Sequence, residues 1–349
     1  MTGEEQPLVL VTGASGKIGR HVVSELRERG YRVRAVTSKA VRDGVGSEGI
    51  EWRQLDFRRS LDFDPLVQGC LAVLHLAAEI TAVEQMQRSN VEATRALAQA
   101  CERAGVRFLG YTSSVAVYGS SRRGLVTEDS PVLTHDRDVP SEYWAEDYLR
   151  CYGRTKLQGE LAIREVANSV ERAIVRPTVV VDTSDLLALS EWSKVMKQRG
   201  AARHAHHIYV RDVADAILWL MEQALDRDEA SSDVRVFNLS EDHAPIRTYG
   251  QLFDSTYKAT GDKRWRVLPL PGAVEWLWVI LKRRRLILRQ PFGRTLFSGG
   301  RLLDEGYKFR FGMSHAITDF SGELASRGLR RGGGEGAGAS AGIPLCEFV

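Results

Sequence analysis

The feature that most constrains the fold lies near the N-terminus, where a short apolar run is followed at once by a glycine-rich turn. Pro7–Val11 has the composition of a buried strand, and Thr12–Gly19 reads T-G-A-S-G-K-I-G. A helical pattern follows, with apolar residues at Val22, Val23 and Leu26. This order predicts a dinucleotide site, because glycines let the backbone approach a pyrophosphate at a helix N-terminus. A turn that only links a strand to a helix is the alternative.

A second feature is the pair Tyr152 and Lys156, four positions apart in a stretch of helix-forming residues. That spacing places both side chains on one helical face. A phenol in water has a pKa near ~10, and a neighbouring ammonium lowers it. The pair therefore predicts a general acid and base that works near neutral pH. A surface helix with a solvated lysine is the alternative.

Further motifs accompany these two in a fixed order along the chain: Leu55–Phe57, Leu74–Ala78, Asn90–Thr94, Tyr111–Gly119, Val175–Thr178 and Ile208–Asp215. With the G-x-x-G-x-x-G turn and the Tyr/Lys pair, they make the chain resemble the extended branch of the short-chain dehydrogenase/reductase superfamily. This branch is often called the NAD-dependent epimerase/dehydratase family. The resemblance covers roughly residues 8 to 320.

The resemblance implies a catalytic set in which Ser114 polarises the substrate, Tyr152 is the acid and base, and Lys156 lowers the tyrosine pKa and binds the ribose. It also implies a cofactor site: Gly13, Ser15, Gly16, Lys17, Ile18 and Gly19 at the pyrophosphate, Asp56 and Phe57 beside the adenine, Ala77, Ala78 and Asn90 on the path to the nicotinamide ribose, and Pro177 and Thr178 beside the ring. Taken singly, Asp56, Ser114 and Asn90 also read as strand ends and a helix cap.

Cofactor choice depends on the end of the second expected strand, Tyr31–Lys39. An NAD site usually carries an acid there for the ribose 2′-hydroxyl, whereas a 2′-phosphate requires a cation. The acid is absent, and Ser38, Lys39 and Lys17 are available. We therefore expect NADP(H) to be preferred, and the nearby Asp43 leaves NAD(H) open.

Length and patterning predict an α/β fold. The 349 residues, 43% of them apolar, can bury a large core and a smaller lobe. Alternating strands and helices up to about residue 180 predict a Rossmann-type doubly wound parallel sheet. The resemblance implies a smaller C-terminal substrate lobe, and Ile174–Val181 and Val234–Leu239 are expected to add strands to the main sheet. We expect three regions: a dinucleotide-binding domain over 1–180 with sheet strands added from about 205–240, a substrate lobe over 181–325, and a disordered Gly-rich tail over 326–349.

Composition excludes some partners. The net charge is only +3 and the arginines are scattered, so no nucleic acid is expected. Cysteines at 70, 101, 151 and 346 lack metal-ligand spacing and are expected to be reduced thiols. His204, His206 and His207 lack a carboxylate or cysteine partner at fixed spacing, so we expect a strand-edge cluster and no metal.

The first strand is reached by residue 8, which leaves no room for a signal peptide and favours a cytoplasmic location.

One apolar segment, Val267–Leu281, is too short to span a bilayer, which needs ~20 residues. A weak contact with a membrane surface stays open, with Trp276 and Trp278 as anchors and the basic run Lys282–Arg285 facing lipid phosphates. A helix that covers an apolar substrate pocket or a dimer surface is the favoured alternative.

An insertion precedes the catalytic tyrosine, between Pro131 and Tyr152, and is longer than the link usual in the family. Its position predicts a lid whose Tyr143, Trp144 and Tyr148 contact the substrate. A solvated surface helix is the alternative.

The expected reaction is narrowed by residues that differ from other branches of the family. Val115 and Ala116 stand where dehydrating members carry an acidic pair. Val179 and Ala205 stand near the asparagine and arginine of nucleotide-sugar epimerases. What remains resembles the hydroxysteroid dehydrogenase and ketoreductase side, which implies hydride transfer with a hydrophobic small-molecule alcohol or ketone, in a homodimer. A nucleotide-sugar epimerase with tightly bound NAD and a non-enzymatic cofactor-sensing protein stay as alternatives.

Overall fold

The structure is a computed structural model that describes residues 6–41, 49–119, 124–133, 147–166, 169–227, 233–268, 277 and 295–326. Its centre is a seven-stranded parallel sheet in the order β10-β7-β5-β4-β1-β2-β3. The strands are β1 (Leu8–Thr12), β2 (Arg32–Thr37), β3 (Ile50–Gln54), β4 (Ala72–His75), β5 (Phe108–Thr112), β7 (Glu171–Pro177) and β10 (Val234–Leu239). The predicted doubly wound Rossmann-type sheet is confirmed. Chain order reverses between β1 and β4, and in open parallel sheets ligands bind beyond the carboxyl ends of the strands at such a point.

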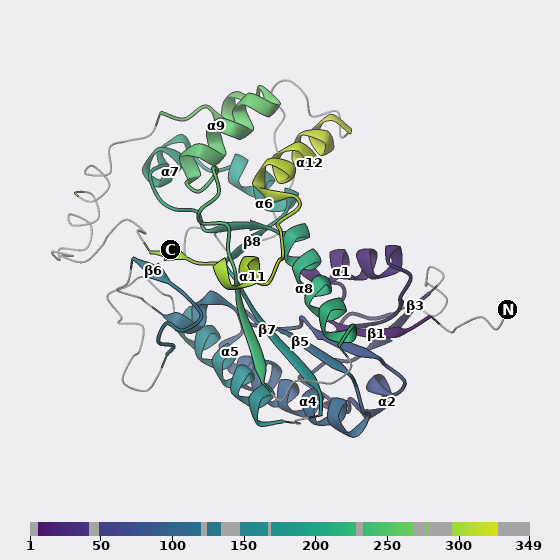
Figure 1. Cartoon of the computed structure of the whole chain (residues 1–349). Helices are drawn as coiled ribbons and strands as arrows, with labels where there is room; N and C mark the ends of the chain where they lie inside the picture. Colours follow the sequence, from purple (N-terminus) through teal and green to yellow (C-terminus); the bar gives the residue numbers. More distant parts are fainter. Residues whose placement is uncertain are drawn as a thin grey trace.

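Helices cover both faces of the sheet (Figure 1). On one face lie α1 (Lys17–Glu28) and α8 (Val210–Leu225). On the other lie α2 (Asp64–Val67), α4 (Ala93–Arg103) and α5 (Asp147–Glu165). A short helix α3 (Val83–Met86) and a π-helical segment η1 (Gln87–Glu92) lead into α4. Buried on both faces, the central strands are nearly continuous apolar runs, as in β1 and β5.

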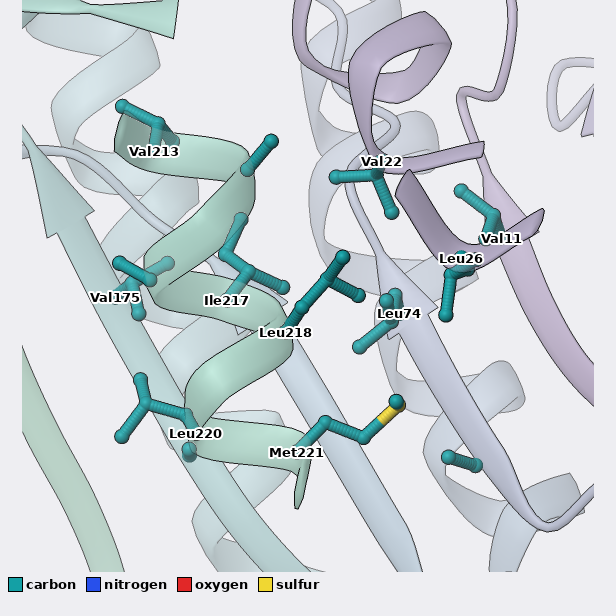
Figure 2. Close-up of a cluster of buried hydrophobic side chains, with 14 of the residues drawn as sticks. Val11, Val22, Leu26, Leu74, Val175, Val213, Ile217, Leu218, Leu220 and Met221 are labelled. Atoms are coloured by element: carbon teal, nitrogen blue, oxygen red, sulfur yellow. The ribbon is translucent and has the colours of Figure 1, made fainter. Parts of the chain in front are cut away.

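The helix α8 packs beside α1 on the same face of the sheet (Figure 2). Its Ile217, Leu218 and Met221 lie in one buried cluster with Leu26 of α1 and Leu74 of β4. At ~25 cal/mol per Å² of apolar surface removed from water, such a cluster is a main source of stability. It fixes α1, and with it the glycine turn, against the strand ends.

A smaller lobe stands beyond the carboxyl edge of the sheet (Figure 1). Its helices are α6 (Thr183–Ser190), α7 (Lys194–Gly200), α9 (Tyr249–Thr260) and α12 (Gly312–Ser326), with the 3-10 turn η3 (Lys263–Trp265). Aromatic side chains fill its core, where Trp265 packs against Phe253 and Phe320. Further elements near the sheet are the 3-10 turn η2 (Val115–Tyr118), α11 (Gly300–Asp304) and the pair β6 (Leu125–Val126) and β11 (Leu296–Phe297).

One detail of the predicted sheet is wrong. Ile174–Val181 was expected to form a single strand of the main sheet, but β7 ends at Pro177. After Thr178, the separate strand β8 (Val179–Val181) pairs only with β9 (His207–Tyr209) in a small second sheet. Of the strands expected from 205–240, therefore, β10 joins the main sheet and β9 does not. Proline lacks an N–H, which limits further pairing at the end of β7.

Candidate active site

The glycine turn between β1 and α1 forms an open backbone cradle. Gly13 has a φ of 67°, and a Cβ added there would lie 2.8 Å from the Ala77 nitrogen. A Cβ at Gly19 would collide with the Gly13 carbonyl oxygen. Gly16 is the exposed N-cap of α1 and brings no side-chain cap to the first N–H groups of the helix. These N–H groups and the positive end of the helix dipole fit the pyrophosphate of a dinucleotide.

Lys17 points from this turn toward the substrate lobe. Its Nζ donates to the Asp185 carboxylate at 2.5 Å and to the Val180 carbonyl at 3.3 Å. One turn further along α1, Arg20 forms an ion pair with Asp182. Two ion pairs therefore join α1 to the start of α6. The expectation that Lys17 acts together with Lys39 at a 2′-phosphate has no support from this arrangement.

The end of β2 carries the residues on which cofactor choice depends. Ser38 and Lys39 are exposed there, and the Lys39 backbone N–H donates to Thr37 Oγ1 at 3.2 Å. The same hydroxyl lies 2.8 Å from Ser15 Oγ, which links the glycine turn to this strand end. Asp43, the acidic residue that keeps NAD(H) possible as the cofactor, lies outside the described residues.

Asp56 and Phe57 follow β3 on the adenine side of the expected site. The Asp56 carboxylate accepts two bonds from the Arg58 guanidinium, both at 2.8 Å, and these hold its pKa below its usual range. Phe57 is buried edge-on against Phe63, with ring centroids 5.2 Å apart. Ile18, in the turn itself, packs between the sheet core and the lobe core.

Asn90 lies in the π-helical segment η1, and π-turns are frequent at functional sites. Its amide bonds both backbone groups of Glu79, with Oδ1 accepting at 2.7 Å and Nδ2 donating at 2.8 Å. The half-buried Ala77 and Ala78 precede this clamp after the end of β4. Nδ2 also donates to Thr155 of α5 at 3.1 Å, so Asn90 connects the loop after β4 with the helix of Tyr152.

A buried hydrogen-bond chain that no sequence motif indicates runs beneath these residues. The Ala77 N–H donates to Thr12 Oγ1, and that hydroxyl lies 2.7 Å from His75 Nδ1. His75 Nε2 lies 2.9 Å from Thr94 Oγ1, which donates to the Asn90 carbonyl. Burial lowers the pKa of His75 to about 3, so the ring is neutral. With the ring proton on Nε2, every donor in this chain has a hydrogen-bond acceptor.

Ser114, Tyr152 and Lys156 meet where the turn η2 packs on α5. Ser114 is the N-cap of η2, and its Oγ accepts the Ala116 N–H at 3.2 Å. Tyr152 is half-buried and hydrogen-bonded to Ser114. Lys156 is almost fully buried, with Nζ 4.1 Å from the centre of the Tyr111 ring. The structure thus brings together the three residues expected to be catalytic.

Two glycines of α5, not identified from the sequence, allow this close packing. A Cβ on Gly153 would lie 2.6 Å from the Ala116 carbonyl oxygen of η2. A Cβ on Gly159 would lie 2.9 Å from the Asn90 carbonyl oxygen and collide with the Tyr111 hydroxyl. Only residues without side chains let α5 approach both neighbours at these distances. The signal lies in tertiary contacts, which a single sequence does not show.

The acid–base properties differ from the expectation. Burial raises the pKa of Tyr152 to about 12, and the hydrogen bond with Ser114 opposes the rise. Burial also lowers the pKa of Lys156 to about 7, against the attraction of Glu160. The prediction that Lys156 brings the tyrosine pKa toward neutrality has no support in this structure, because burial dominates the shift and raises the pKa. Tyr152 is a neutral phenol at physiological pH.

Glu160 extends the same face of α5 one turn beyond Lys156. Its carboxylate forms a two-point ion pair with Arg176 of β7, at 2.8 and 2.6 Å, and accepts the Ser113 hydroxyl at 2.5 Å. Arg176 also donates to the Tyr118 hydroxyl of η2 at 2.8 Å. Ser113, Glu160 and Arg176 are all buried. This network holds β5, α5, η2 and β7 together behind the catalytic residues.

Pro177 and Thr178 end β7 beside the same edge. Both are buried, and the Thr178 N–H and hydroxyl both donate to the Leu239 carbonyl at the end of β10. Of the expected substrate contacts, Tyr143 and Trp144 lie outside the described residues. For Tyr148, only the backbone within α5 is described. These contacts stay predictions.

In the described parts of the chain, no group of three or more His, Cys, Asp or Glu side chains is placed to hold a metal ion. Across the same residues, no helix has the length and apolar character needed to cross a membrane. Most of the expected membrane-surface segment and residues 327–349 of the expected tail are not described.

The fold and the site together define a dinucleotide-dependent enzyme of the Rossmann type. Comparison with known proteins makes this specific, since residues 9–182 match the NAD dependent epimerase/dehydratase family. The chain belongs to this family.

The individual relatives include reductases, a sterol dehydrogenase and an epimerase. A putative dihydroflavonol 4-reductase from Synechocystis sp. is 33% identical over 145 residues, which cover 39% of this chain and only 42% of that protein. The decarboxylating sterol-4-alpha-carboxylate 3-dehydrogenase of Dictyostelium discoideum is 23% identical, covering 78% of this chain and 83% of that protein. The crystal structure of a short-chain dehydrogenase/reductase superfamily protein from Agrobacterium tumefaciens, with bound NAD, has a TM-score of 0.65 and is 23% identical in sequence. The match covers 93% of this chain and 100% of that chain, and it concerns the fold alone.

Proposed function

We propose that this protein is an NAD(P)-dependent reductase that interconverts a ketone and a secondary alcohol on a small hydrophobic molecule. The observation that carries the proposal is the half-buried, protonated Tyr152 hydrogen-bonded to Ser114. It lies on the helix that Asn90 and Thr155 link to the loop after β4. A neutral phenol is a competent proton donor, whereas it is a poor base. The arrangement is therefore suited to give a proton to the oxygen of a substrate carbonyl.

In this proposal the cofactor is held by the glycine cradle, with Asp56 and Phe57 beside the adenine and Pro177 and Thr178 beside the nicotinamide. When bound, the reduced nicotinamide supplies the hydride to the carbonyl carbon. Ser114 orients the carbonyl oxygen, and Tyr152 gives that oxygen its proton. An alkoxide is a far stronger base than a phenolate, so this transfer is downhill even with a tyrosine pKa of about 12.

Lys156 has two tasks in the proposal, binding the ribose and restoring the proton of Tyr152. With its pKa lowered to about 7, it exchanges protons readily near neutral pH. The attraction of Glu160 keeps part of the lysine protonated in spite of its burial. Lys156 is thus a proton reservoir for Tyr152, and does not hold the phenol as an anion.

The substrate class follows from what the cleft residues lack. Val115 and Ala116 of η2 offer no acid for eliminating water. Val179 and the buried Ala205 offer no group that grips a diphosphate. The relatives named as a flavonoid reductase and a sterol dehydrogenase act on largely apolar ring systems, and their likeness supports a substrate of that kind here.

The test is the Tyr152→Phe variant, assayed with a panel of steroid and aromatic ketones by following nicotinamide absorbance. We expect turnover to fall about 10²- to 10⁴-fold while the dinucleotide still binds. Tyr257→Phe, on α9 of the lobe, is the matched control and should keep full activity. Full activity in Tyr152→Phe would overturn the assignment.

The same panel separates the two rival functions. An epimerase would convert a UDP-hexose into a mixture of epimers with no net change in nicotinamide absorbance. A cofactor-sensing protein would bind dinucleotide and reduce no ketone, with or without the Tyr152 hydroxyl. The family description supports the epimerase as the runner-up.

We further propose that NADP(H) is the preferred cofactor. The support is the exposed pair Ser38 and Lys39 at the end of β2, where no described residue of that strand end is acidic. Lys17 no longer adds to this argument because it is bound to Asp185. Titration with both cofactors tests the proposal, and Lys39→Glu should weaken NADPH selectively. Tighter binding of NADH than of NADPH by the wild type would refute it.

For assembly we propose a homodimer through α4 and α5, where Leu161 is 48% exposed on an otherwise polar outer face.

For location we propose the cytoplasm, supported by thiols at Cys70, Cys101 and Cys151 that form no disulfide. Cell fractionation tests the location, and recovery in an oxidising compartment would contradict it.

A further inference from the structure

His206 has an unusual backbone for its residue type. Its φ is 48°, and among the described residues it is the only non-glycine residue with a positive φ. Such a conformation is strained for most side chains, and strain of this kind concentrates at functional sites. The side chain is almost completely buried, as is that of its partner Asp242. A strained, buried histidine with a carboxylate partner calls for a reason beyond packing.

The Asp242 carboxylate fixes the ring of His206. Oδ2 lies 2.7 Å from His206 Nδ1 and also accepts the Phe297 N–H at 2.8 Å. The Phe297 ring meets the imidazole edge-on at 5.3 Å, and His204 stacks on it at 5.8 Å. A carboxylate at Nδ1 selects the tautomer with the proton on Nδ1 and leaves a lone pair on Nε2. Among the described residues we find no hydrogen-bond partner for Nε2.

Two contacts place His206 close to the proposed reaction site. Its carbonyl accepts the Val179 N–H at 2.9 Å, directly after the Pro177–Thr178 segment. On the other side, Phe297 packs at 6.2 Å against Tyr118, in the turn that begins after Ser114. His206 therefore borders the carboxyl edge of the sheet at some distance from Tyr152. A substrate held by both residues would have its carbonyl at Tyr152 and its far end at His206.

The chemistry of this corner selects a particular group. The Asp242 carboxylate makes the surroundings of His206 acidic, which disfavours a carboxylate ligand. A lone pair on Nε2 requires a hydrogen-bond donor. We propose that His206 is a specificity residue that accepts a hydrogen bond from a hydroxyl group at the end of the substrate remote from the carbonyl. This inference rests on the proposed reductase function and adds to it a polar, hydroxylated substrate end.

The test compares three saturated steroid ketones that differ only at the far ring, which carries a methyl, a hydroxyl or a carboxylate group. The wild type should favour the hydroxyl compound in kcat/KM by roughly tenfold, the usual worth of one hydrogen bond. His206→Asn and His206→Gly, two residues that tolerate positive φ, should lose this preference through KM and keep kcat for the methyl compound. His243→Asn, an exposed histidine beside Asp242, is the matched control and should keep it.

The outcomes separate the two proposals. A wild type that reduces all three ketones equally, or variants that keep the preference for hydroxyl, would overturn the role of His206 and leave the reductase intact. A preference for the carboxylate would also overturn it. A wild type that reduces no ketone although it binds dinucleotide would refute the proposed function, and this inference with it.

Discussion

Replacing Gly153 by alanine is the sharpest test of how the catalytic residues are positioned. Gly153 directly follows Tyr152 in α5, and its Cα faces the backbone of η2, which begins after Ser114. A Cβ at this position would lie 2.6 Å from the Ala116 carbonyl oxygen and 3.1 Å from Leu133 Cδ1. The first neighbour is backbone and has no rotamer by which to move away. The helix and the turn must therefore separate.

The magnitude follows from two opposing effects. Alanine in place of glycine in a helix interior raises stability by ~1 kcal/mol. Overpacking a buried contact costs ~1–3 kcal/mol. We expect Gly153→Ala to lower the free energy of unfolding by up to about 2 kcal/mol. A displacement of about 1 Å between Tyr152 and Ser114 should lower kcat by roughly tenfold to a hundredfold, because proton transfer depends steeply on geometry.

The assays are urea denaturation and steady-state kinetics, and α12 offers a matched control. Gly322 lies inside that helix, and an added Cβ there meets nothing within 4 Å. Gly322→Ala should gain ~1 kcal/mol and keep its activity. If Gly153→Ala were as stable and as active as Gly322→Ala, the close packing of α5 on η2 would not be what positions Tyr152.

Three further changes test the surroundings of the site. The folded pKa of Lys156 is about 7 against 10.5 in the unfolded chain, so the unfolded state binds more protons between these values. Stability should rise with pH across that window by roughly 2 kcal/mol over two pH units, and Lys156→Met should abolish the rise in denaturation curves. Glu160→Gln breaks the buried ion pair with Arg176 and should lower the free energy of unfolding by ~3–5 kcal/mol. Loss of the exposed ion pair between Arg95 and Glu165 should lower it by less than ~1 kcal/mol. Leu161→Glu should yield monomers by light scattering if α5 forms the dimer face, and an unchanged mass would exclude that face.

How much of the fold could be predicted follows from the range of the determining interactions. The glycine turn and the strand that precedes it depend on local sequence, so they could be predicted. The order of the further motifs along the chain predicted the parallel sheet. The break at Thr178 was missed, because Val179–Val181 reads as strand whichever sheet it joins. Its partner β9 lies far along the chain, and single-sequence patterns do not identify partners.

For the site, residue identity was easier to predict than residue environment. Tyr152 and Lys156 were predicted from their spacing and Ser114 from the family resemblance, and Tyr152 is hydrogen-bonded to Ser114. Their proton affinities were misjudged, because desolvation depends on the packing around both groups and on no local pattern. Lys17 was similarly assigned to a phosphate by its place in the turn, although Asp185 on a distant helix captures it.

A series of hydrogen-bonded residues explains how two separate sequence motifs form one site. From Thr12 at the glycine turn, hydrogen bonds run through His75 and Thr94 to Asn90, and from Asn90 through Thr155 to the Tyr152 carbonyl. The links from Thr12 to Thr155 are buried and the last one is partly buried, so breaking a buried link leaves a polar group unsatisfied at a cost of ~1–3 kcal/mol. The cradle and the catalytic helix consequently cannot shift independently. We therefore expect a cofactor held by the first to be aligned with the phenol of the second.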